Sequence, residues 1–452
     1  MQLISIITIV VLSSGCALAY NKTHNQQWKL WKNKHRKNYS DAEELVRRAV
    51  WENNLKMIEE HNLQADLGVH TYRLGMNQHG DLTASEVVQK YTGVKVNMET
   101  KYSQVREVLV SNSTASLPSS VDWRNQNVVE AVKDQGACGS CWAFSVAGAI
   151  GSAYAIKTGT LVSLSEQQLN DCSGVVGNDG CNGGWPDNGF VYVINAGGIE
   201  TESSYPYKAV DQTCMFNATD IAVKVCDFVE LPSGDEAALQ QAVATIGPIS
   251  VLVDASHTSF QFYQSGVYNE PTCSQTILDH AVLLIGYGTE GDNDYWLVKN
   301  SWGTSWGEQG YIKMTRNQNN QCGIATMANY PIICSSNMQP VPRQPVYHPT
   351  SDAFCLTPNM FLMIVLKDDT KESEELRKDL IKSVRNTIGA HVNPDVIHFT
   401  PDLPKTRSGK IMRRILRKIV EPDTSNLGDI STLTDPSIVK ELIKKSPRTK
   451  HS

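Results

Sequence analysis

The stretch that decides the fold is Gln135-Gly136-Ala137-Cys138-Gly139-Ser140-Cys141-Trp142. Small and apolar residues follow it over 143–150 and indicate a buried helix that begins near Cys141. A cysteine in the first turn of a helix meets free N–H groups and the positive end of the helix dipole, which favour a thiolate. The stretch therefore indicates a reactive cysteine, although two cysteines at this spacing also permit a metal or redox pair.

A thiolate nucleophile needs an imidazole partner, and His280 lies further along in Leu278-Asp279-His280-Ala281. Asn300 follows in Lys299-Asn300-Ser301-Trp302-Gly303, and Cys181-Asn182-Gly183-Gly184 lies between the cysteine and the histidine. This signature and rough spacing are typical of papain and cathepsin proteases. Residues from about 20 to 334 resemble a papain-family cysteine protease precursor of the cathepsin L branch. The resemblance implies an α+β, papain-like two-lobe fold, with a helical lobe and an antiparallel β-barrel-like lobe.

The resemblance also assigns the chemistry. It implies that Cys141 is the nucleophile and that His280 accepts and then donates the proton. Asn300 would orient the imidazole, and Trp302 would shield their hydrogen bond from water. Gln135 would donate its side-chain amide to the developing oxyanion, beside the backbone N–H of Cys141.

Substrate binding is expected at the backbone of Gly183 and Gly184, where a peptide strand approaches closely. By resemblance, a pocket for the P2 side chain has apolar walls and floor, formed by Trp185, Pro186, Leu252, Leu278, Ala281 and Met327. We therefore expect an endopeptidase that prefers hydrophobic or aromatic P2 residues and cleaves poorly after P2 arginine. The partners expected are protein and peptide substrates, the chain's own propeptide and cystatin-like inhibitors.

The chain has 11 cysteines, and most should pair in a secretory protein. The resemblance implies the bridges Cys138–Cys181, Cys172–Cys214 and Cys273–Cys322. A bridge between Cys226 and Cys334 is left open, with Cys355 also unassigned. Zinc is the competing interpretation for Cys138 and Cys141, but no second close cysteine pair exists, so we expect no metal and no cofactor.

Residues 1–19 predict a signal peptide, because an apolar run precedes Ala17-Leu18-Ala19. Residues 20–115 predict an inhibitory propeptide that lies along the cleft in reverse direction. Within it, one helix face carries a motif of the cathepsin L-like pro-regions, formed by Glu43, Arg47, Trp51, Asn54, Ile58 and Asn62. Gly75, Asn77 and Asp81 match a second pro-region motif, in which His79 stands where the family usually carries phenylalanine.

Residues 91–116 are interpreted as a polar connector, with the processing cut within a few residues of 112–117. Residues 20–115 hold 14 Lys and Arg against 11 Asp and Glu, whereas 116–334 hold 8 against 22. The resulting net charges, +3 and −14, are complementary at neutral pH. Because acid protonates carboxylates, we hypothesise maturation that is acid-triggered and self-catalysed.

Strand-like runs dominate the second half of the protease segment 116–334. Residues 249–253, 281–287 and 295–299 predict antiparallel strands separated by turn residues. The first half is more helical, and Ser165-Glu166 is expected to cap a short helix.

The composition changes after Cys334, where prolines mark a linker over 335–360. Residues 361–452 suggest a small α/β module, with a strand at 361–366 and a helix at 374–382. Residues from about 361 to 422, including Pro404-Lys405-Thr406-Arg407-Ser408-Gly409-Lys410, resemble the end of AMP-forming acetyl-CoA synthetases. The large adenylating domain is not found in the chain, so we expect no ligase activity. We interpret the tail as a merged gene model or read-through, with a genuine extension that is trimmed in the endosome as the alternative.

Two function classes remain open: an active endopeptidase, and a catalytically silent binding or inhibitor protein on the same scaffold. The retention of Cys141, His280, Asn300 and Gln135 favours the enzyme. Sequons for N-glycosylation lie at Asn21, Asn38, Asn112 and Asn217. We expect a monomer in lysosomal or endosomal vesicles, or a secreted one, with no nucleic-acid partner and no membrane span after signal cleavage.

Overall fold

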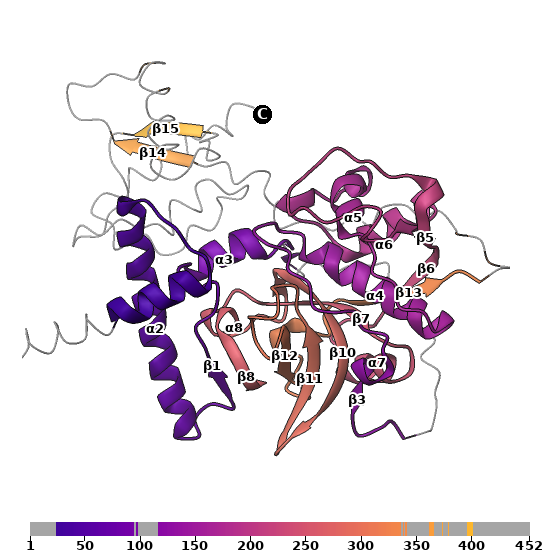
Figure 1. The fold of residues 1–452 in the computed structure, drawn as a ribbon, viewed down its shortest axis with the longest axis horizontal. Coiled ribbons are helices and arrows are strands. Elements are labelled where there is room, and N and C mark those ends of the chain that lie inside the picture. The colour runs from indigo at the N-terminus through magenta and orange to yellow at the C-terminus, as the bar shows by residue number, and fades with distance from the viewer. Residues whose placement is uncertain are drawn as a thin grey trace, which may run out of the picture. The chain divides into compact units, whose positions relative to one another are not determined.

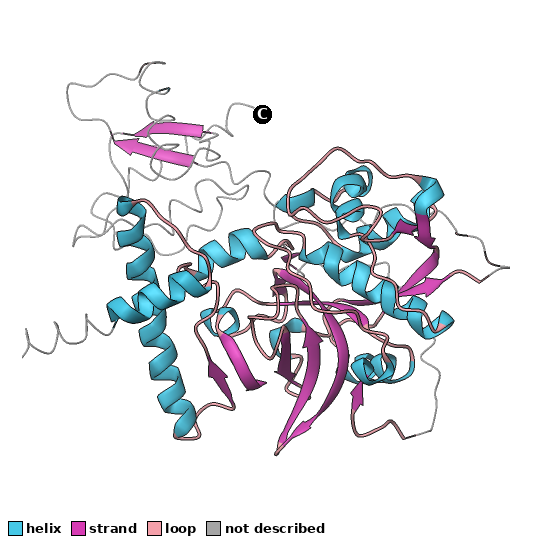
Figure 2. Cartoon of the chain, in the orientation of Figure 1, coloured by secondary structure: helices cyan, strands magenta, loops and turns pink. Residues whose placement is uncertain are grey.

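The computed structural model describes residues 24–94, 96–97 and 116–335, two strands at 361–365 and 396–400, and four isolated positions (338, 340, 373 and 378). The chain divides into two compact units, Met1–His348 and Pro349–Ser452. The first unit contains the helices and the large sheet drawn in Figures 1 and 2. Among the described residues, no helix is both long enough and apolar enough to cross a membrane.

The N-terminal segment is helical, as predicted. Residues 24–34 form a helix, followed by α2 (Asp41–Asp66), β1 (Tyr72–Leu74), α3 (Ala84–Tyr91) and β2 (Val96–Asn97). Ser40 caps α2, and Thr83 with Glu86 forms a capping box on α3, which satisfies N–H groups that each helix would otherwise leave free.

The predicted face of α2 is confirmed, since its apolar members are buried and its amide members bond to residues after the helix. Trp51 and Ile58 are buried. The side-chain amide of Asn54 donates to the carbonyls of Gly80 and Leu82. The Asn62 amide donates to the carbonyl of Leu74 at 2.8 Å. This face therefore fixes the turn that carries the second pro-region motif.

The second pro-region motif binds the protease segment. The side-chain amide of Asn77 donates to the Gln261 carbonyl at 2.7 Å, and the Gly75 N–H donates to the Phe262 carbonyl. A Cβ at Gly75 would lie 2.7 Å from the end of the Gln264 side chain, which is exposed and could move aside. Asp81 stays inside the propeptide segment and accepts hydrogen bonds from Lys37 and Tyr39.

Three helices form the first lobe: α4 (Cys141–Thr158), α5 (Glu166–Cys172) and α6 (Pro186–Ala196). Almost every residue of α4 up to Ser152 is buried, which explains its small and apolar sequence. The side chain of Ser165 caps α5, as predicted. The 3-10 turns η2 (Ser173–Val176) and η3 (Gly180–Asn182) connect α5 to α6, and η1 (Trp123–Gln126) precedes α4. The elements β4 (Ile199–Glu200), η4 (Ala218–Asp220) and β5 (Ile221–Val223) follow α6.

The second lobe is a nine-stranded sheet with the order β1-β8-β12-β11-β10-β7-β13-β6, with β3 on β10. Its strands are β3 (Val121–Asp122), β6 (Val225–Glu230), β7 (Ile249–Val253), β8 (Tyr263–Tyr268), β10 (His280–Glu290), β11 (Asn293–Lys299), β12 (Tyr311–Thr315) and β13 (Ala328–Ile333), with α7 (Glu236–Thr245), α8 (Thr258–Gln261), β9 (Ile277–Leu278) and η5 (Gln321–Gly323) beside them. The three predicted strands are confirmed as β7, β10 and β11.

One pairing departs from the expected antiparallel lobe, since β12 and β8 run parallel. In addition, β1 of the N-terminal segment pairs with β8, with Tyr72 opposite Gly266. The sheet is therefore mixed, and the propeptide segment supplies its edge strand.

All three expected disulfides are present, Cys138–Cys181, Cys172–Cys214 and Cys273–Cys322. The bridge left open, Cys226–Cys334, also forms. It lies where β6 pairs with β13, beside the register partners Val225 and Ile333. Because Cys138 is bonded to Cys181, its sulfur is not available for the alternative zinc site.

In the second unit, β14 (Phe361–Val365) pairs in parallel with β15 (Val396–Thr400). The predicted strand at 361–366 is thus confirmed to within one residue. The signal peptide, most of the connector, Asn21, Asn112, Cys355 and Lys410 lie outside the described residues. So does the predicted helix at 374–382, except at Lys378.

Candidate active site

Cys141 is the first residue of α4 and is fully buried. It is also the one cysteine among the described residues that is not in a disulfide. The backbone N–H of Ala281, the residue after His280, donates to its Sγ at 3.5 Å. The structure thus brings the predicted nucleophile against the start of β10, although 139 positions separate Cys141 from His280 in sequence.

A β-hairpin places the histidine beside the asparagine. β10 begins at His280 and β11 ends at Lys299, and the two strands are antiparallel neighbours. The Nε2–H of His280 donates to Asn300 Oδ1 at 2.8 Å, and the N–H of Ser301 donates to the same oxygen at 2.7 Å. The second donor fixes the amide orientation. His280 Nδ1 hydrogen-bonds to no residue that the structure describes, so this nitrogen remains available for proton transfer.

Aromatic rings cover this hydrogen bond, as predicted for Trp302. The Trp302 indole lies over the His280 imidazole, with ring centroids 4.9 Å apart and planes 38° apart. Phe260 and Trp306 pack against the indole in turn. Trp302 is fully buried, so water is excluded from the His280–Asn300 contact.

Gln135 is held between the cysteine loop and the asparagine loop. Its backbone N–H donates to the Ser301 carbonyl at 2.8 Å, and Ser301 Oγ donates to Gln135 Oε1 at 2.6 Å. The side-chain Nε2 therefore points away from Ser301. It donates to the Cys138 carbonyl at 2.7 Å and to the Tyr91 carbonyl at 3.0 Å.

The N-terminal segment occupies this site directly. The Tyr91 carbonyl accepts from Gln135 Nε2 and from Trp302 Nε1, the latter at 3.1 Å. Two residues on, the Gly93 carbonyl accepts from the Gly184 N–H at 2.9 Å. The N–H of Val94 then donates to the Asp279 carbonyl at 3.0 Å. A backbone that satisfies these enzyme groups prevents any other peptide from reaching them.

Glycine is required where the two backbones meet. A Cβ at Gly93 would lie 1.7 Å from the Gly139 carbonyl oxygen, and one at Gly183 would lie 2.4 Å from the Gly93 oxygen. Gly183 also has φ of +128°, which side chains rarely adopt. A Cβ at Gly184 would clash with the Trp142 indole at 2.6 Å. The predicted strand-binding glycines therefore lie where close approach occurs.

Five of the six predicted P2 pocket residues belong to the same hydrophobic core as Val94 of the propeptide. One buried apolar cluster contains Val94 together with Trp185, Leu252, Leu278, Ala281 and Met327. Pro186 is buried at the first position of α6, next to Trp185. Beyond Val94, β2 pairs antiparallel with β9, with Val96 opposite Leu278.

Burial controls the ionisation of the pair in this covered state. It raises the pKa of the Cys141 thiol to about 12, although N–H groups of Ala281 and Gly93 oppose the shift. It also lowers the pKa of His280 to about 4, opposed by the hydrogen bond to Asn300. The covered pair therefore favours neutral thiol and neutral imidazole. The thiolate–imidazolium pair expected from the sequence remains a prediction for the uncovered site.

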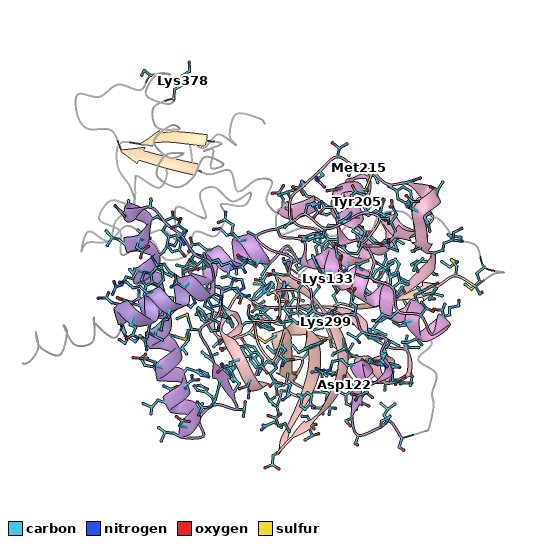
Figure 3. All side chains as sticks on the ribbon, in the orientation of Figure 1. Asp122, Lys133, Tyr205, Met215, Lys299 and Lys378 are labelled. Carbon is cyan, nitrogen blue, oxygen red and sulfur yellow. A yellow bond between two sulfur atoms is a disulfide. The ribbon has the colours of Figure 1, made fainter. Side chains whose placement is uncertain are left out.

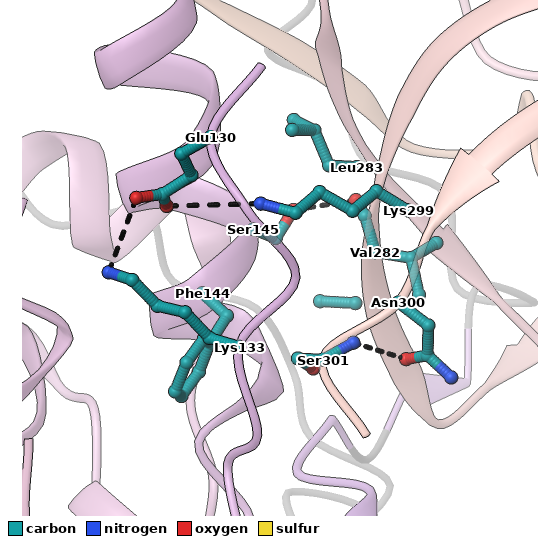
Figure 4. A pocket seen from close by; sticks show the side chains of 10 residues that line it. Glu130, Lys133, Phe144, Ser145, Val282, Leu283, Lys299, Asn300 and Ser301 are labelled. Carbon is teal, nitrogen blue, oxygen red and sulfur yellow. Dashed lines mark hydrogen bonds and ion pairs between the residues drawn. The ribbon is translucent and has the colours of Figure 1, made fainter. Parts of the chain in front are cut away.

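Partly buried and buried charges lie next to the site. A cavity of about 20 Å³ is lined by Glu130, Lys133, Lys299, Asn300 and Ser301 among others. Glu130 Oε2 lies 3.4 Å from Lys133 Nζ, and its Oε1 lies 3.9 Å from Lys299 Nζ. Figure 4 draws both ion pairs as dashed lines. Both lysines are labelled near the centre of the unit in Figure 3. Glu130 thus bridges the chain before the cysteine loop to the residue that precedes Asn300.

Comparisons with known proteins agree with this geometry. The sequence model described as papain family cysteine protease matches residues 117–332, and the cathepsin propeptide inhibitor domain (I29) matches 28–87. A cathepsin L-like peptidase of Aedes aegypti is 47% identical over 337 residues, which cover 73% of this chain and 99% of that protein.

The chain belongs to the papain family of cysteine proteases. Cathepsin S of Mus musculus is 49% identical over 319 residues, covering 70% of this chain and 93% of that protein. The structure of digestive procathepsin L 3 from Tenebrio molitor larval midgut matches with a TM-score of 0.63 at 44% identity, over 68% of this chain and 98% of that one. This papain-family member is therefore a cathepsin L-like cysteine protease zymogen whose propeptide precedes the protease domain.

The tail of this papain-family chain has a match of its own. The AMP-binding enzyme C-terminal domain matches residues 359–410. The match begins just before β14 and ends at Lys410, which lies outside the described residues. It agrees with the resemblance found from the sequence and covers no part of the protease.

The residues that block the cleft are not evident from the sequence. Residues 91–94 were assigned to a polar connector, but Thr92, Gly93 and Val94 are buried there. Their sequence has no periodic pattern, because their partners come from the enzyme and not from their own segment. The one signal in this stretch was Gly93 itself, since a glycine permits the close approach of another backbone. Ser301, which orients Gln135, was quoted in a motif but given no role.

Proposed function

We propose that the mature protease hydrolyses peptide bonds through Cys141, His280 and Asn300, with Gln135 as an oxyanion donor. The main support for this proposal is one hydrogen bond. In the site covered by the propeptide, Gln135 Nε2 donates to a peptide carbonyl, that of Tyr91. A substrate carbonyl at that position would be polarised in the same way. Removal of one such donor typically costs about a hundredfold to a thousandfold in kcat.

The reaction follows from the positions of these groups. The Cys141 thiolate attacks the scissile carbonyl carbon, and the developing oxyanion accepts from Gln135 Nε2 and from the Cys141 backbone N–H. The His280 imidazolium then gives its proton to the leaving amine, which departs as the C–N bond breaks. Water attacks the resulting thioester, His280 takes the proton from that water, and the acid product leaves with the thiol group regenerated.

Asn300 acts on the imidazole and not on the substrate. Its Oδ1 accepts from Nε2–H, which leaves Nδ1 as the nitrogen that exchanges the proton. Trp302 keeps water from competing for that hydrogen bond.

The direction of the propeptide supports an inhibitory role. A substrate that places P2 in the apolar pocket and its scissile carbonyl at Gln135 runs from the pocket toward Gln135. Residues 91–94 run the opposite way, from the Gln135 contact of Tyr91 to Val94 in the pocket cluster. The reversed chain fills the subsites without presenting a cleavable bond in the productive orientation.

Substrate preference follows from the pocket. Its residues are apolar and belong, like Val94, to one buried hydrophobic cluster, so hydrophobic or aromatic P2 residues should bind best. A P2 arginine would place a charge among these residues without a partner. Turnover of matched dipeptide reporters with Phe or Arg at P2, both with Arg at P1, tests this, and comparable kcat/KM values would contradict it.

The decisive experiment separates an enzyme from a silent binding protein. The mature protein should hydrolyse a Phe-Arg reporter with thiol reductant present, and an epoxide inhibitor should label Cys141. Cys141→Ser is the matched variant, since it changes one atom and should abolish both. Unchanged hydrolysis by that variant, or an inert wild type, would overturn the proposed function.

The proposal also covers the partners of the protein, its cellular route and its tail. We propose a monomer that acts on proteins, is inhibited by cystatin-like proteins and travels to lysosomes or is secreted. Asn38 and Asn217 are exposed, as glycosylation would require. We also propose that residues 361–452 add no ligase activity and come from a merged gene model or read-through. Mass spectrometry of the native protein checks this, because peptides spanning 334–361 would overturn it.

A further inference from the structure

Tyr207 lies against both ends of the loop that carries the oxyanion donors. Its hydroxyl donates to the backbone carbonyl of Gln135 at 2.9 Å. The same hydroxyl oxygen lies 2.5 Å from Ser140 Oγ, next to Cys141. Gln135 and Ser140 are fully buried. One hydroxyl therefore joins the residue that supplies the side-chain donor to the residue that precedes the nucleophile.

The donors and acceptors available fix the direction of the two hydrogen bonds that Tyr207 makes with Gln135 and Ser140. A carbonyl oxygen accepts only, so the single Tyr207 proton is committed to Gln135. Ser140 must then donate its own proton to the Tyr207 oxygen. Consistent with this, Ser140 makes no side-chain cap hydrogen bond to α4. Burial raises the pKa of Tyr207 far above its ordinary value, despite the bond from Ser140, so the hydroxyl keeps its proton.

The tyrosine is itself fixed from two directions. Its ring packs edge-on against Phe144 of α4, with centroids 4.9 Å apart and planes 82° apart. Its backbone N–H donates to Glu202 Oε1 at 2.8 Å. The hydroxyl is therefore a rigid point between the loop and the helix, and not a mobile surface group.

We propose that Tyr207 is a positioning residue that sets the Gln135 amide relative to the start of α4 and thereby preserves the geometry of the oxyanion hole. This rests on the proposed function and deepens it. Ser301 restrains the Gln135 side chain from the asparagine loop, whereas Tyr207 restrains its backbone from the helical lobe. Catalysis by fixed dipoles depends on such restraint, because misplacement of about 1 Å costs on the order of a hundredfold.

The variant Tyr207→Phe removes only the hydroxyl and keeps the ring against Phe144. The matched control is Tyr287→Phe, which removes a hydroxyl that donates to the Pro118 carbonyl at 2.7 Å, away from the site. In enzyme matured from the full precursor, we expect Tyr207→Phe to lower kcat about tenfold with little change in KM, and Tyr287→Phe to leave both unchanged.

Two further measurements distinguish positioning from general damage. Alkylation of Cys141 by iodoacetamide builds no oxyanion, so its rate and pH profile should be the same in wild type and Tyr207→Phe. That profile also reports His280, which precedes the Ala281 N–H donor to the sulfur, and Asp279, whose charge acts on the thiol, and both groups are intact in the variant. In a Gln135→Ala background, Tyr207→Phe should have almost no further effect on kcat, because its contribution acts through Gln135.

Three results would overturn the proposal: an unchanged kcat in Tyr207→Phe, a parallel loss of alkylation rate, or a full tenfold effect in the Gln135→Ala background. Ser140→Ala gives an independent check, since it keeps the bond to Gln135 and should cost less than Tyr207→Phe. An inert wild-type enzyme would instead remove the proposed function, and this inference with it, so the two failures are distinguishable.

Discussion

The imidazole of His79 packs edge-on against the indole of Trp302, with ring centroids 5.4 Å apart and planes 71° apart. Tyr91 packs on the same imidazole at 4.4 Å. His79, which stands where the family usually carries phenylalanine, thus lies between Tyr91 of the propeptide and Trp302, the ring that shields His280. It fills an aromatic position, but unlike phenylalanine it can take up a proton.

This contact predicts an acid-sensitive propeptide. Burial, with a smaller repulsion from Lys37 and His35 and a partial attraction from Asp81, lowers the pKa of His79 from 6.5 to about 3. The released segment regains the ordinary value. Docking is therefore at full strength above pH 6.5 and weakens by about 1.4 kcal/mol per pH unit as the pH falls toward 3.

His79→Phe should remove this acid sensitivity. At pH 4.5 the penalty amounts to about 3 kcal/mol, on the order of a hundredfold, so the variant precursor should mature at least about tenfold more slowly there than wild type. At pH 7 the two should differ little. Timed gels of precursor processing measure this, with His70→Gln as control, since His70 contacts Gln64 and not the site. Identical pH dependence in wild type and His79→Phe would contradict the prediction.

The opposite net charges of the propeptide and the protease are a weaker basis for acid-triggered maturation than the His79 contact. Each ion pair recorded for residues 24–94 joins two residues of that segment, and among the described residues none reaches 116–335. The opposite net charges therefore act at long range, where salt screens them over about 8 Å at physiological ionic strength. Acid-triggered maturation remains a prediction, with His79 as its short-range component.

The sequence predicted the reactive groups better than the surface that covers them. Cys141, His280 and Asn300 lie in short motifs whose context repeats across a family, and the β10–β11 hairpin that joins two of them follows from two strand-like runs and a turn. The bridge Cys226–Cys334 could not be chosen from three unassigned cysteines, because only the β6–β13 register brings those two together. Residues 91–94 were missed for a similar reason, since their burial depends on the cleft.

The nucleophile should be chemically silent in the precursor. Burial raises the pKa of Cys141 to about 12, so almost no thiolate exists at pH 7 while residues 91–94 cover the sulfur. Removal of the propeptide restores solvent and permits the ion pair with His280. We expect iodoacetamide to alkylate Cys141 at least about a hundredfold faster in mature enzyme than in precursor at pH 7. Peptide mass spectrometry of briefly treated samples checks this, and equal rates would count against it.

The fourth disulfide should contribute substantially to stability. Cys226 and Cys334 are 108 residues apart, and the Cys273–Cys322 bridge within that span shortens the loop that they close. Chain entropy for such a loop corresponds to about 4 kcal/mol. In a Cys141→Ser background, which prevents autolysis, the double variant Cys226→Ala and Cys334→Ala should lose about that free energy of unfolding. Guanidinium titration measures it, and a loss below about 1 kcal/mol would show that the bridge is not a main constraint.

Gly93→Ala should weaken propeptide binding while leaving the sequence of the mature enzyme unchanged. The added Cβ would lie 1.7 Å from the Gly139 carbonyl oxygen, a backbone atom that cannot move aside as a side chain would. The segment must shift, which breaks the bond between the Gly184 N–H and the Gly93 carbonyl and loosens the contact of Tyr91 with Gln135. The variant precursor should therefore mature faster at pH 7, by roughly tenfold for about 1.4 kcal/mol of lost docking. Gln89→Ala, on the exposed side of α3, is the matched control and should mature at the wild-type rate. A Gly93→Ala precursor that stays as latent as wild type would mean that residues 91–94 do not control access to Cys141.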